Sequence, residues 1–364
     1  MSMSLTFCRD VMIKMREMGY HMVAVTSPGP ELDDLRDKDG FRCVGVPMCR
    51  HVSLLSDLKS LMRLIVVFGK ERPWAVHSMT PKAGLLCMVA AWLTRVPVRV
   101  HTFTGLVWPT ATGLKRRVLM MTDRITCACA THVIPEGRGV MEDLRRGGIT
   151  RKPMRVLGYG NVMGVDMTRF SPARFAQRGQ SGVFTFLFVG RIVRDKGINE
   201  LVEAFARLHA DHSATRLVLV GNYERSLDPV SDDTQRLIDT CDAIAAVGPK
   251  RGDDLVHEYA AADGFVMPSY REGFPNTVLE AGAMGLPSIV TDINGSREIV
   301  ENGENGFVVP PRDAIALHDA MERMLTDSEV RQRMARKARP MIAARFDRDF
   351  VQRCQIEFYK KVMG

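Results

Sequence analysis

The sequence predicts an α/β protein built from two doubly wound domains. Its 364 residues suit two domains. Short β-branched runs alternate with amphipathic segments, which is typical of parallel sheets covered by helices. This alternation starts again after a Gly- and Arg-rich stretch near Phe175–Gly182. We therefore expect an N-terminal domain at 1–175, a second domain at 180–345, and a last helix within 346–364 that could pack on either half.

The elements of the first half follow from the spacing of apolar residues along the chain. The strands expected there are Met22–Thr26, Phe41–Val46, Ala75–Ser78, Val96–Phe103 and Thr131–Pro135. The helices expected there are Phe7–Met18, Leu54–Lys70, Lys82–Thr94 and Leu114–Cys129.

The start of the chain departs from the doubly wound pattern. Such a domain opens with a strand and a tight turn before its first helix, whereas this chain begins directly with the helix at Phe7–Met18. The sequence therefore predicts that the first strand of the N-terminal domain is missing, through truncation or a start assigned too late. A fold without this strand would have an open sheet edge or a gap.

The second half repeats the alternation, and its first strand is a fully apolar run. The strands expected are Phe184–Val189, Arg216–Val220, Gly264–Pro268, Pro287–Thr291 and Gly306–Val309. The helices expected are Ile198–His209, Leu255–Ala262, Asn276–Met284 and the final Asp349–Val362. Apolar runs of this kind are buried on both faces, as strands of a parallel sheet are.

Composition excludes several classes of protein. No run of about 18 apolar residues is present, so no transmembrane helix is expected. The eight cysteines have irregular spacing and form no Cys-x-x-Cys pair, which favours reduced thiols in a cytoplasmic protein. Cys127 and Cys129 are at most a weak metal candidate, because no second ligand pair follows them.

The positive charge is concentrated in the first half. Residues 1–176 contain 26 Lys and Arg against 14 Asp and Glu, while the whole chain has a net charge of +8. This imbalance, with a local cluster at 115–117, suggests an anionic partner such as a membrane surface or a phosphate-bearing acceptor. Solvated surface charge is the alternative. Nucleic acid is disfavoured because no aromatic residues are interleaved and no binding module is recognisable.

A basic loop follows the first strand of the second half. It reads Gly190-Arg191-Ile192-Val193-Arg194-Asp195-Lys196-Gly197 and leads into a helix. Backbone N–H groups at a helix N-terminus favour an anion. Arg191 and Lys196 would add the two cations that suit a diphosphate. Neither the phosphate loop of ATPases nor the dinucleotide glycine fingerprint is present.

Two carboxylates, Glu272 and Glu280, stand eight positions apart in the second half. Glu272 belongs to a Glu-Gly-Phe-Pro-Asn turn and Glu280 to the predicted helix that follows. Together they suggest a site for two parts of one hydroxyl-rich ligand. The turn amides of 273–276 could add donors, and Gly273 allows a close approach.

These motifs together resemble glycosyltransferase family 4, whose GT-B architecture places two Rossmann-like domains on either side of a cleft. The resemblance covers nearly the whole chain, and its first half is similar to bacterial members that act on lipid-linked glycans. In the second half it rests on the basic loop, the Glu272–Glu280 stretch and four further segments: 257–263, 285–287, 294–300 and 305–309. In the first half it rests on 27–32, 80–84 and 110–116.

The resemblance implies a role for each matching residue. Arg191 and Lys196 would neutralise the donor diphosphate, Glu272 would hold the donor sugar, and Glu280 would hold the ribose. The remaining donor-binding candidates are Gly190, Gly273, Phe274, Pro275, Asn276 and Thr277. Such enzymes retain the anomeric configuration, and no metal or other cofactor is implied.

One departure from the family pattern concerns histidine. Related enzymes often place a histidine after the fourth strand of the first domain, and that position holds Thr104 here. His101, within the expected strand, is a weak catalytic candidate or a packed strand residue. His77 is a second weak candidate at a strand end.

The sequence thus favours a retaining glycosyltransferase that works peripherally on the inner face of the cell membrane. It would move a sugar from a nucleotide-sugar, expected to be a UDP-sugar, to a lipid-linked saccharide. Capsule, O-antigen or another exopolysaccharide would be the product. The alternatives are a nucleotide-sugar epimerase of the same fold and an inactive remnant that only binds UDP. The missing strand is what suggests the remnant.

Overall fold

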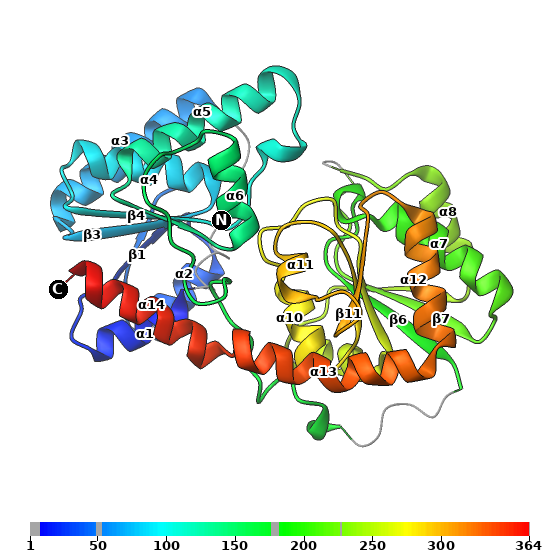
Figure 1. Cartoon of the computed structure of the whole chain (residues 1–364). Helices are drawn as coiled ribbons and strands as arrows, with labels where there is room; N and C mark the ends of the chain where they lie inside the picture. The colour runs from blue at the N-terminus through cyan, green and yellow to red at the C-terminus, as the bar shows by residue number, and fades with distance from the viewer. Residues whose placement is uncertain (1–7, 49–52, 176–181, 226–227, 364) are drawn as a thin grey trace. The chain divides into compact units, whose positions relative to one another are not determined.

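The chain forms two compact units in the computed structural model, which describes residues 8–48, 53–175, 182–225 and 228–363 (Figure 1). The first unit comprises Met1–Met163 and Asp349–Gly364, and the second comprises Gly164–Arg348. The last helix, α14 (Arg348–Met363), therefore lies with the first unit. The expected break between the domains, at 175–180, falls on residues 176–181, which are outside the described part.

Parallel strands form two sheets in the first unit. β1 (Val23–Thr26) pairs with β2 (Arg42–Gly45). β4 (Val98–Phe103) lies between β3 (Ala75–Met79) and β5 (His132–Pro135). All five strands lie within two residues of their predicted ends, because their apolar runs are short and bounded by turn residues.

β1 and β2 form one sheet and β3, β4 and β5 form another, and no pairing joins the two sheets in the described part. In the doubly wound order, a first strand would lie between these two. Residues 1–7 precede the first described helix, α1 (Arg9–Glu17), and are outside the described part. The missing first strand therefore stays a prediction.

Helices cover both faces of the β3-β4-β5 sheet. On one face α4 (Pro81–Leu93) packs on β3 and β4, and it also contacts α3 (Leu54–Glu71) and α5 (Gly113–Cys129). On the other face Phe358 of α14 packs with strand residues Val98, Val100 and Ile134. The remaining helices of this unit are α2 (Pro30–Asp37) and α6 (Arg138–Arg146).

The second unit contains a six-stranded parallel sheet in the order β11-β10-β9-β6-β7-β8. If β6 is counted as strand 1 of this unit and the order is read from β8 to β11, it becomes 3-2-1-4-5-6, which is the arrangement of a Rossmann fold. Its strands are β6 (Phe184–Val189), β7 (Thr215–Val220), β8 (Ile244–Gly248), β9 (Gly264–Met267), β10 (Ser288–Thr291) and β11 (Gly306–Val309). The strand order reverses between β6 and β9, and ligands of open α/β sheets bind beside the carboxyl ends of the strands at such a point.

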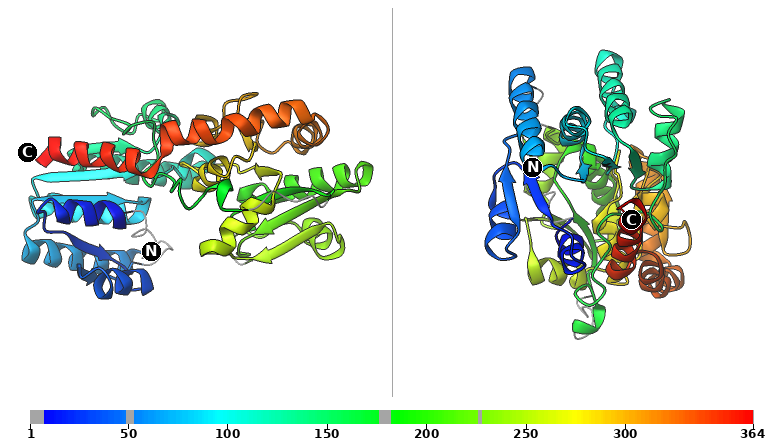
Figure 2. Two further views of the ribbon diagram at one scale, coloured as in Figure 1. Left: turned by 90° about the horizontal axis from the view of Figure 1, so that it is seen from below. Right: turned by 90° about the vertical axis from the view of Figure 1, so that its left-hand side faces the viewer.

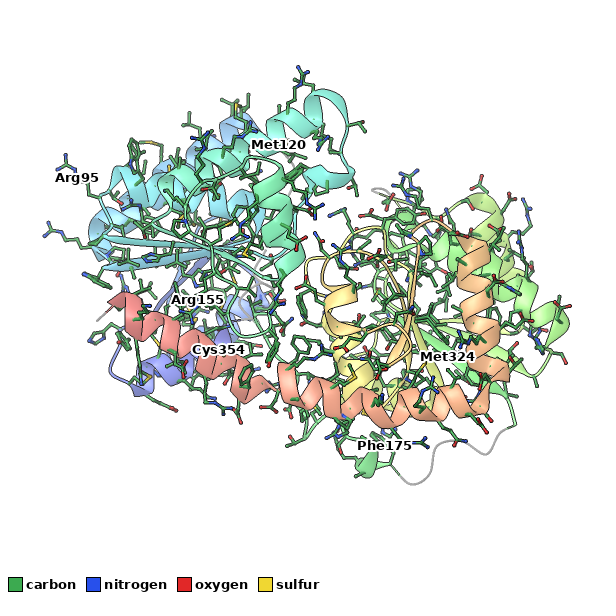
Figure 3. All side chains as sticks on the ribbon, in the orientation of Figure 1. Arg95, Met120, Arg155, Phe175, Met324 and Cys354 are labelled. Carbon is green, nitrogen blue, oxygen red and sulfur yellow. The ribbon has the colours of Figure 1, made fainter. Side chains whose placement is uncertain are left out.

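Helices pack on both faces of this sheet, as Figure 2 shows from two directions. They are α7 (Ile198–Asp211), α8 (Asp232–Thr240), α9 (Gly252–Ala261), α10 (Asn276–Ala283), α11 (Ser296–Ile299) and α12 (Ala314–Thr326). Helix α13 (Ser328–Phe346) packs on α10 and α12. Met324 of α12 is fully buried and is labelled in Figure 3. Phe186, Phe205 and Tyr259 are also fully buried, so the second unit has a continuous core that holds its strand ends in place.

No helix in the described part of the chain is both long and apolar enough to cross a membrane.

Candidate functional site

The basic loop after β6 is held close to the end of β9. A short turn, Arg194–Lys196, ends at Gly197, whose φ of +70° lies in the left-handed region. A Cβ atom at this position would lie 2.0 Å from the carbonyl oxygen of Pro268, so only glycine fits. The sequence therefore brings the basic loop against the segment that carries Glu272.

Polar contacts then join the two loops. The Tyr270 amide donates to the Asp195 carbonyl at 2.9 Å, and Arg271 pairs with the Asp195 carboxylate at 2.7 Å. Beside them, Lys196 forms an ion pair with Glu272, and only 17% and 14% of these two side chains are exposed. The structure thus brings Lys196 and Glu272 together at the point where the strand order reverses.

Arg191 also has an acidic partner. Its guanidinium pairs with Glu224, which follows β7, and both side chains are partly exposed. In addition, Asp228 accepts a hydrogen bond from the Asp195 amide at 2.7 Å. Both cations that the sequence predicts to bind phosphate are therefore paired with carboxylates in this structure.

Glu224 and Asp228 were not among the site residues predicted from the sequence. Glu224 lies three residues beyond Gly221, at the carboxyl end of β7, which is the edge of the sheet that carries the other site residues. This position after a strand is the signal that could have identified it.

Two contacts hold the Gly-Phe-Pro-Asn turn in place, one with α13 and one with the loop after β10. Phe274 is buried, and its ring centroid lies 5.3 Å from that of Phe346 in α13. The loop after β10 packs closely on the turn, because a Cβ atom on Gly295 would lie only 2.3 Å from the Gly273 carbonyl oxygen. Helix α10 begins at Asn276, and the Val278 amide donates to the Pro275 carbonyl at 3.1 Å.

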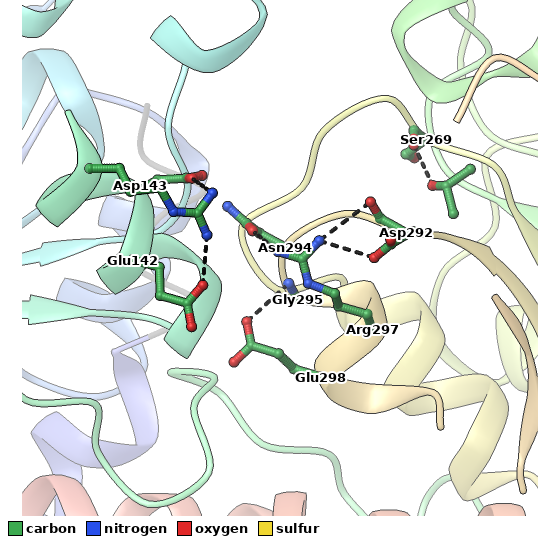
Figure 4. A network of polar contacts seen from close by, with 10 residues as sticks. Glu142, Asp143, Ser269, Asp292, Asn294, Gly295, Arg297 and Glu298 are labelled. Carbon is green, nitrogen blue, oxygen red and sulfur yellow. Dashed lines mark hydrogen bonds and ion pairs between the residues drawn. The ribbon is translucent and has the colours of Figure 1, made fainter. Parts of the chain in front are cut away.

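The loop after β10 has its own polar contacts (Figure 4). Arg297 donates to the side chains of Asp292 at 3.1 Å and Asn294 at 2.9 Å. The Gly295 amide donates to Glu298 at 3.3 Å. These contacts fix the backbone that supports the turn beside Glu272.

Glu280 lies in the second turn of α10, close to the buried Tyr259 of α9. The Tyr259 hydroxyl donates to Glu280 Oε2 at 2.8 Å and lies 3.3 Å from the Thr277 carbonyl oxygen. Desolvation of the carboxyl group raises the pKa of Glu280 to about 7, and the hydrogen bond from Tyr259 acts in the opposite direction. Tyr259 belongs to a segment that carries the family resemblance, but its role as the partner of Glu280 was not foreseen.

His101 lies inside the first unit. It is 1% exposed, and Nδ1 lies 2.8 Å from Ser78 Oγ. A Cβ atom on Gly84 of α4 would lie 2.2 Å from the imidazole Cε1, so α4 packs directly on the ring. Burial lowers the pKa of His101 to about 3. This is the environment of a packed strand residue, the alternative given above, and a catalytic role is left as a prediction only.

His77 faces the opposite side of the same sheet. Nε2 lies 2.7 Å from Thr102 Oγ1, and Nδ1 contacts the hydroxyl of Tyr359 in α14. A cavity of about 10 Å³, roughly the space of one water molecule, adjoins this group. Burial lowers the pKa of His77 to about 4. The imidazole therefore links α14 to the sheet in its neutral form.

This burial predicts a dependence of stability on pH. An unfolded histidine titrates near pH 6.5, whereas folded His77 titrates near 4, so between these values the unfolded chain binds more protons and stability falls as pH falls. Asn is polar but does not titrate in this pH range, so His77→Asn removes this effect. Between pH 7.5 and 5 we expect the free energy of unfolding to fall by about 2 kcal/mol more in wild type than in His77→Asn. Urea unfolding of both proteins at the two pH values measures this difference. The pKa shifts of Glu280 and of other groups are present in both proteins, so they do not contribute to it. Equal losses would contradict a buried neutral His77.

In the described part of the chain, no group of three or more His, Cys, Asp or Glu side chains could hold a metal ion. Metal-independent chemistry, which the family resemblance implies, stays a prediction.

Two family profiles match the chain. "Glycosyl transferases group 1" matches residues 171–341, and "Glycosyl transferase 4-like domain" matches residues 6–160. The first match includes the basic loop and the Glu272–Glu280 stretch.

Two curated relatives match along most of their length. The capsular polysaccharide biosynthesis glycosyltransferase CapM of Staphylococcus aureus is 30% identical over 345 residues, which cover 93% of this chain and 89% of CapM. An Escherichia coli α-1,3-galactosyltransferase named for UDP-Gal and α-D-GlcNAc-diphosphoundecaprenol is 30% identical over 332 residues, which cover 88% of this chain and 83% of that protein.

Solved structures share the fold. A glycosyltransferase of Rickettsia africae has a TM-score of 0.77 at 20% identity, and the match covers 98% of this chain and 94% of the Rickettsia chain. Anabaena HepE in complex with UDP-glucose has a TM-score of 0.79 at 17% identity, and the match covers 98% of this chain and 95% of the HepE chain. These matches confirm the predicted fold, and the chain belongs to the group 1 glycosyltransferases, with a glycosyl transferase 4-like first domain.

Proposed function

We propose that this glycosyltransferase moves a sugar from a UDP-sugar to a lipid-linked saccharide, with retention of configuration, in capsule, O-antigen or exopolysaccharide synthesis. The observation that carries the proposal is the Lys196–Glu272 pair at the point where the strand order reverses, with Glu280 on α10, the helix that follows Glu272 in the chain. The names of the relatives support the class of substrate: one relative acts in capsule synthesis, and another uses UDP-Gal and a diphosphoundecaprenol acceptor.

The two cations would act on the leaving group. As the bond from the anomeric carbon to the diphosphate breaks, negative charge grows on the diphosphate oxygens. Arg191 and Lys196, released from Glu224 and Glu272, would stabilise that charge. The positive end of the α10 helix dipole would favour the same negative charge.

The carboxylates would orient the donor. Glu272 would accept hydrogen bonds from hydroxyl groups of the sugar, and Glu280 from those of the ribose. The acceptor hydroxyl oxygen would form its bond to the anomeric carbon on the face that the diphosphate leaves, and its proton would pass to a diphosphate oxygen. This route needs no metal, so full activity in the presence of EDTA is expected.

The acceptor would meet the basic first unit. A lipid-linked saccharide carries a phosphate group and lies at a membrane surface, and residues 1–176 carry the excess of positive charge. We place the enzyme in the cytoplasm, peripheral to the inner face of the cell membrane. The irregular cysteine spacing supports this placement, and Cys8, Cys43, Cys87, Cys127, Cys129, Cys241 and Cys354 are free thiols in the described part.

A nucleotide-sugar screen tests the function. The purified chain is incubated with UDP-, GDP- and dTDP-sugars, with and without membrane extract, and both products are measured. Release of UDP together with a radiolabelled glycolipid, only when membranes are present, is the expected result. Interconversion of UDP-sugars without an acceptor would instead identify an epimerase. Binding of UDP without turnover would identify an inactive remnant.

The contact between Tyr259 and Glu280 gives a specific prediction. Tyr259→Phe removes a hydrogen bond that favours the ionised carboxylate, so the pKa of Glu280 should rise above its present value of about 7. We expect the donor KM at pH 7 to rise about tenfold, with kcat changed less than about threefold, since one bond to a charged group is lost.

The pH profile separates this role from a structural one. At pH 8.5 Glu280 is largely ionised in both proteins, so the difference in KM should narrow. A KM difference that is constant from pH 6.5 to 8.5, or a fall in kcat alone, would contradict a positioning role for Tyr259.

A further inference from the structure

An exposed apolar surface covers two helices of the first unit. Helices α3 and α5 lie on the same side of the β3-β4-β5 sheet, with α4 in contact with both (Figures 1 and 2). Both helices lie wholly within the described part of the chain. Their outward apolar side chains are 40% to 82% exposed and are Leu54, Leu55, Leu58, Met62 and Val66 on α3, and Leu114, Val118, Met121 and Ile125 on α5. We call this set the apolar face.

The spacing of these residues shows that the exposure is organised. On α5 the positions 114, 118, 121 and 125 recur at intervals of three and four, which places them in one row along the helix. On α3 the positions 55, 58, 62 and 66 form a similar row, while Leu64 and Phe68 point into the core. Each helix therefore has two apolar sides, one packed in the core and one exposed to solvent.

The second unit has no comparable surface in its described part. Its exposed large apolar side chains there are Val183, Leu237 and Ile315, which lie on different elements. Scattered residues of this kind are normal on a protein surface, whereas rows of exposed apolar side chains along a helix are typical of an interaction surface.

Basic side chains flank the apolar face. Lys59, Arg63 and Lys70 are exposed on α3, and Lys115, Arg116, Arg117 and Arg124 are exposed on α5. The acidic residues of the two helices do not offset this charge: Asp57 pairs with Lys82 at 2.6 Å, Glu71 pairs with Arg42, and Asp123 is buried. The outward surface of both helices is therefore apolar and positively charged.

We propose that the apolar face and its flanking cations form a docking surface for an anionic lipid bilayer. Exposed apolar rows can enter the boundary between headgroups and acyl chains, while Lys and Arg bind anionic headgroups. Charge complementarity selects this occupant over a second copy of the chain, because two such faces would repel each other. This inference deepens the proposed peripheral location by naming the surface that carries it.

The test uses the full-length protein and sedimentation with vesicles of phosphatidylcholine containing 30% phosphatidylglycerol, or of phosphatidylcholine alone. The first variant removes apolar area through Leu58→Ser, Met62→Ser, Val118→Ser and Met121→Ser. The second variant removes charge through Lys59→Gln, Arg63→Gln, Lys70→Gln and Arg117→Gln. The matched controls on the second unit are Leu237→Ser with Ile315→Ser, and Arg207→Gln with Arg236→Gln.

We expect wild type and both controls to bind anionic vesicles at least tenfold more strongly than neutral ones. The apolar variant should bind anionic vesicles at least tenfold less strongly than wild type. The charge variant should lose the preference for anionic lipid and most of its salt dependence. Circular dichroism and thermal unfolding check that every variant is folded.

Two results would overturn the proposal. One is equal vesicle binding by wild type and the apolar variant. The other is a wild-type dimer in solution that the same substitutions dissociate, which would assign the face to a second copy. Lys196→Ala separates loss of sugar transfer from loss of membrane binding. This variant should lose transfer and still bind vesicles as strongly as wild type.

Discussion

Lys196→Ala is expected to lower kcat/KM for the UDP-sugar donor by about a thousandfold. The proposed role of Lys196 is to stabilise the charge that develops on the leaving diphosphate, and removal of one such group in a desolvated site costs about two to three orders of magnitude. The affinity for UDP itself should fall at least tenfold, because the product carries the same diphosphate. Steady-state kinetics and calorimetric titration with UDP measure the two effects.

The matched control is Lys337→Ala. Lys337 also pairs with a glutamate of the second unit, Glu304, but on an exposed surface. It should leave transfer unchanged, since exposed pairs contribute little. Thermal unfolding should show both variants folded, with Lys196→Ala destabilised by about 1–3 kcal/mol because Glu272 loses its partner. Wild-type kcat/KM in folded Lys196→Ala would remove Lys196 from the site.

Glu272→Ala is expected to lower kcat by a similar factor of about a thousand, with a different effect on product binding. Glu272 is proposed to hold the sugar, which UDP lacks. The same carboxylate pairs with Lys196 in the empty site, so its removal frees the cation for the diphosphate. The affinity for UDP should therefore stay the same or increase while transfer is lost.

Glu304→Ala is the matched control for this carboxylate, because Glu304 pairs with Lys337 away from the site. The two site variants should also be non-additive: the double variant Lys196→Ala, Glu272→Ala should transfer about as slowly as either single variant. A Glu272→Ala protein that transfers sugar normally, or that loses UDP affinity as strongly as Lys196→Ala, would contradict the assignment of the sugar to Glu272.

Most of the fold could be predicted because apolar runs and turn residues coincide. The strand Phe184–Val189 was predicted at its observed limits, since a fully apolar run between turn residues has few alternatives. The strand β8 was missed because its Ile-Ala-Ala-Val-Gly run has weak β-propensity, and its pairing with β7 determines its conformation. The helices α12 and α13 were missed although Asp313 and Asp327 cap their N-termini, a signal that was present in the sequence.

The candidate site could be predicted only in part. Arg191, Lys196, Glu272 and Glu280 follow strands or turns, so sequence position alone brings them to one edge of the sheet. Sequence position does not give the partners, because the pairing of Arg191 with Glu224 depends on the order of β6 and β7 in the sheet. The contact of Glu280 with Tyr259 depends likewise on how α9 packs against α10.

The most direct test of a nucleotide-sugar site at this point of the second unit is a calorimetric titration of UDP into three proteins. They are wild type, Lys196→Ala at the diphosphate end and Glu280→Ala at the ribose end. A site that runs from Lys196 to Glu280 predicts that UDP binds wild type and that both variants bind it at least tenfold less strongly. Equal dissociation constants in all three proteins, or no binding of UDP to wild type at millimolar concentration, would contradict it.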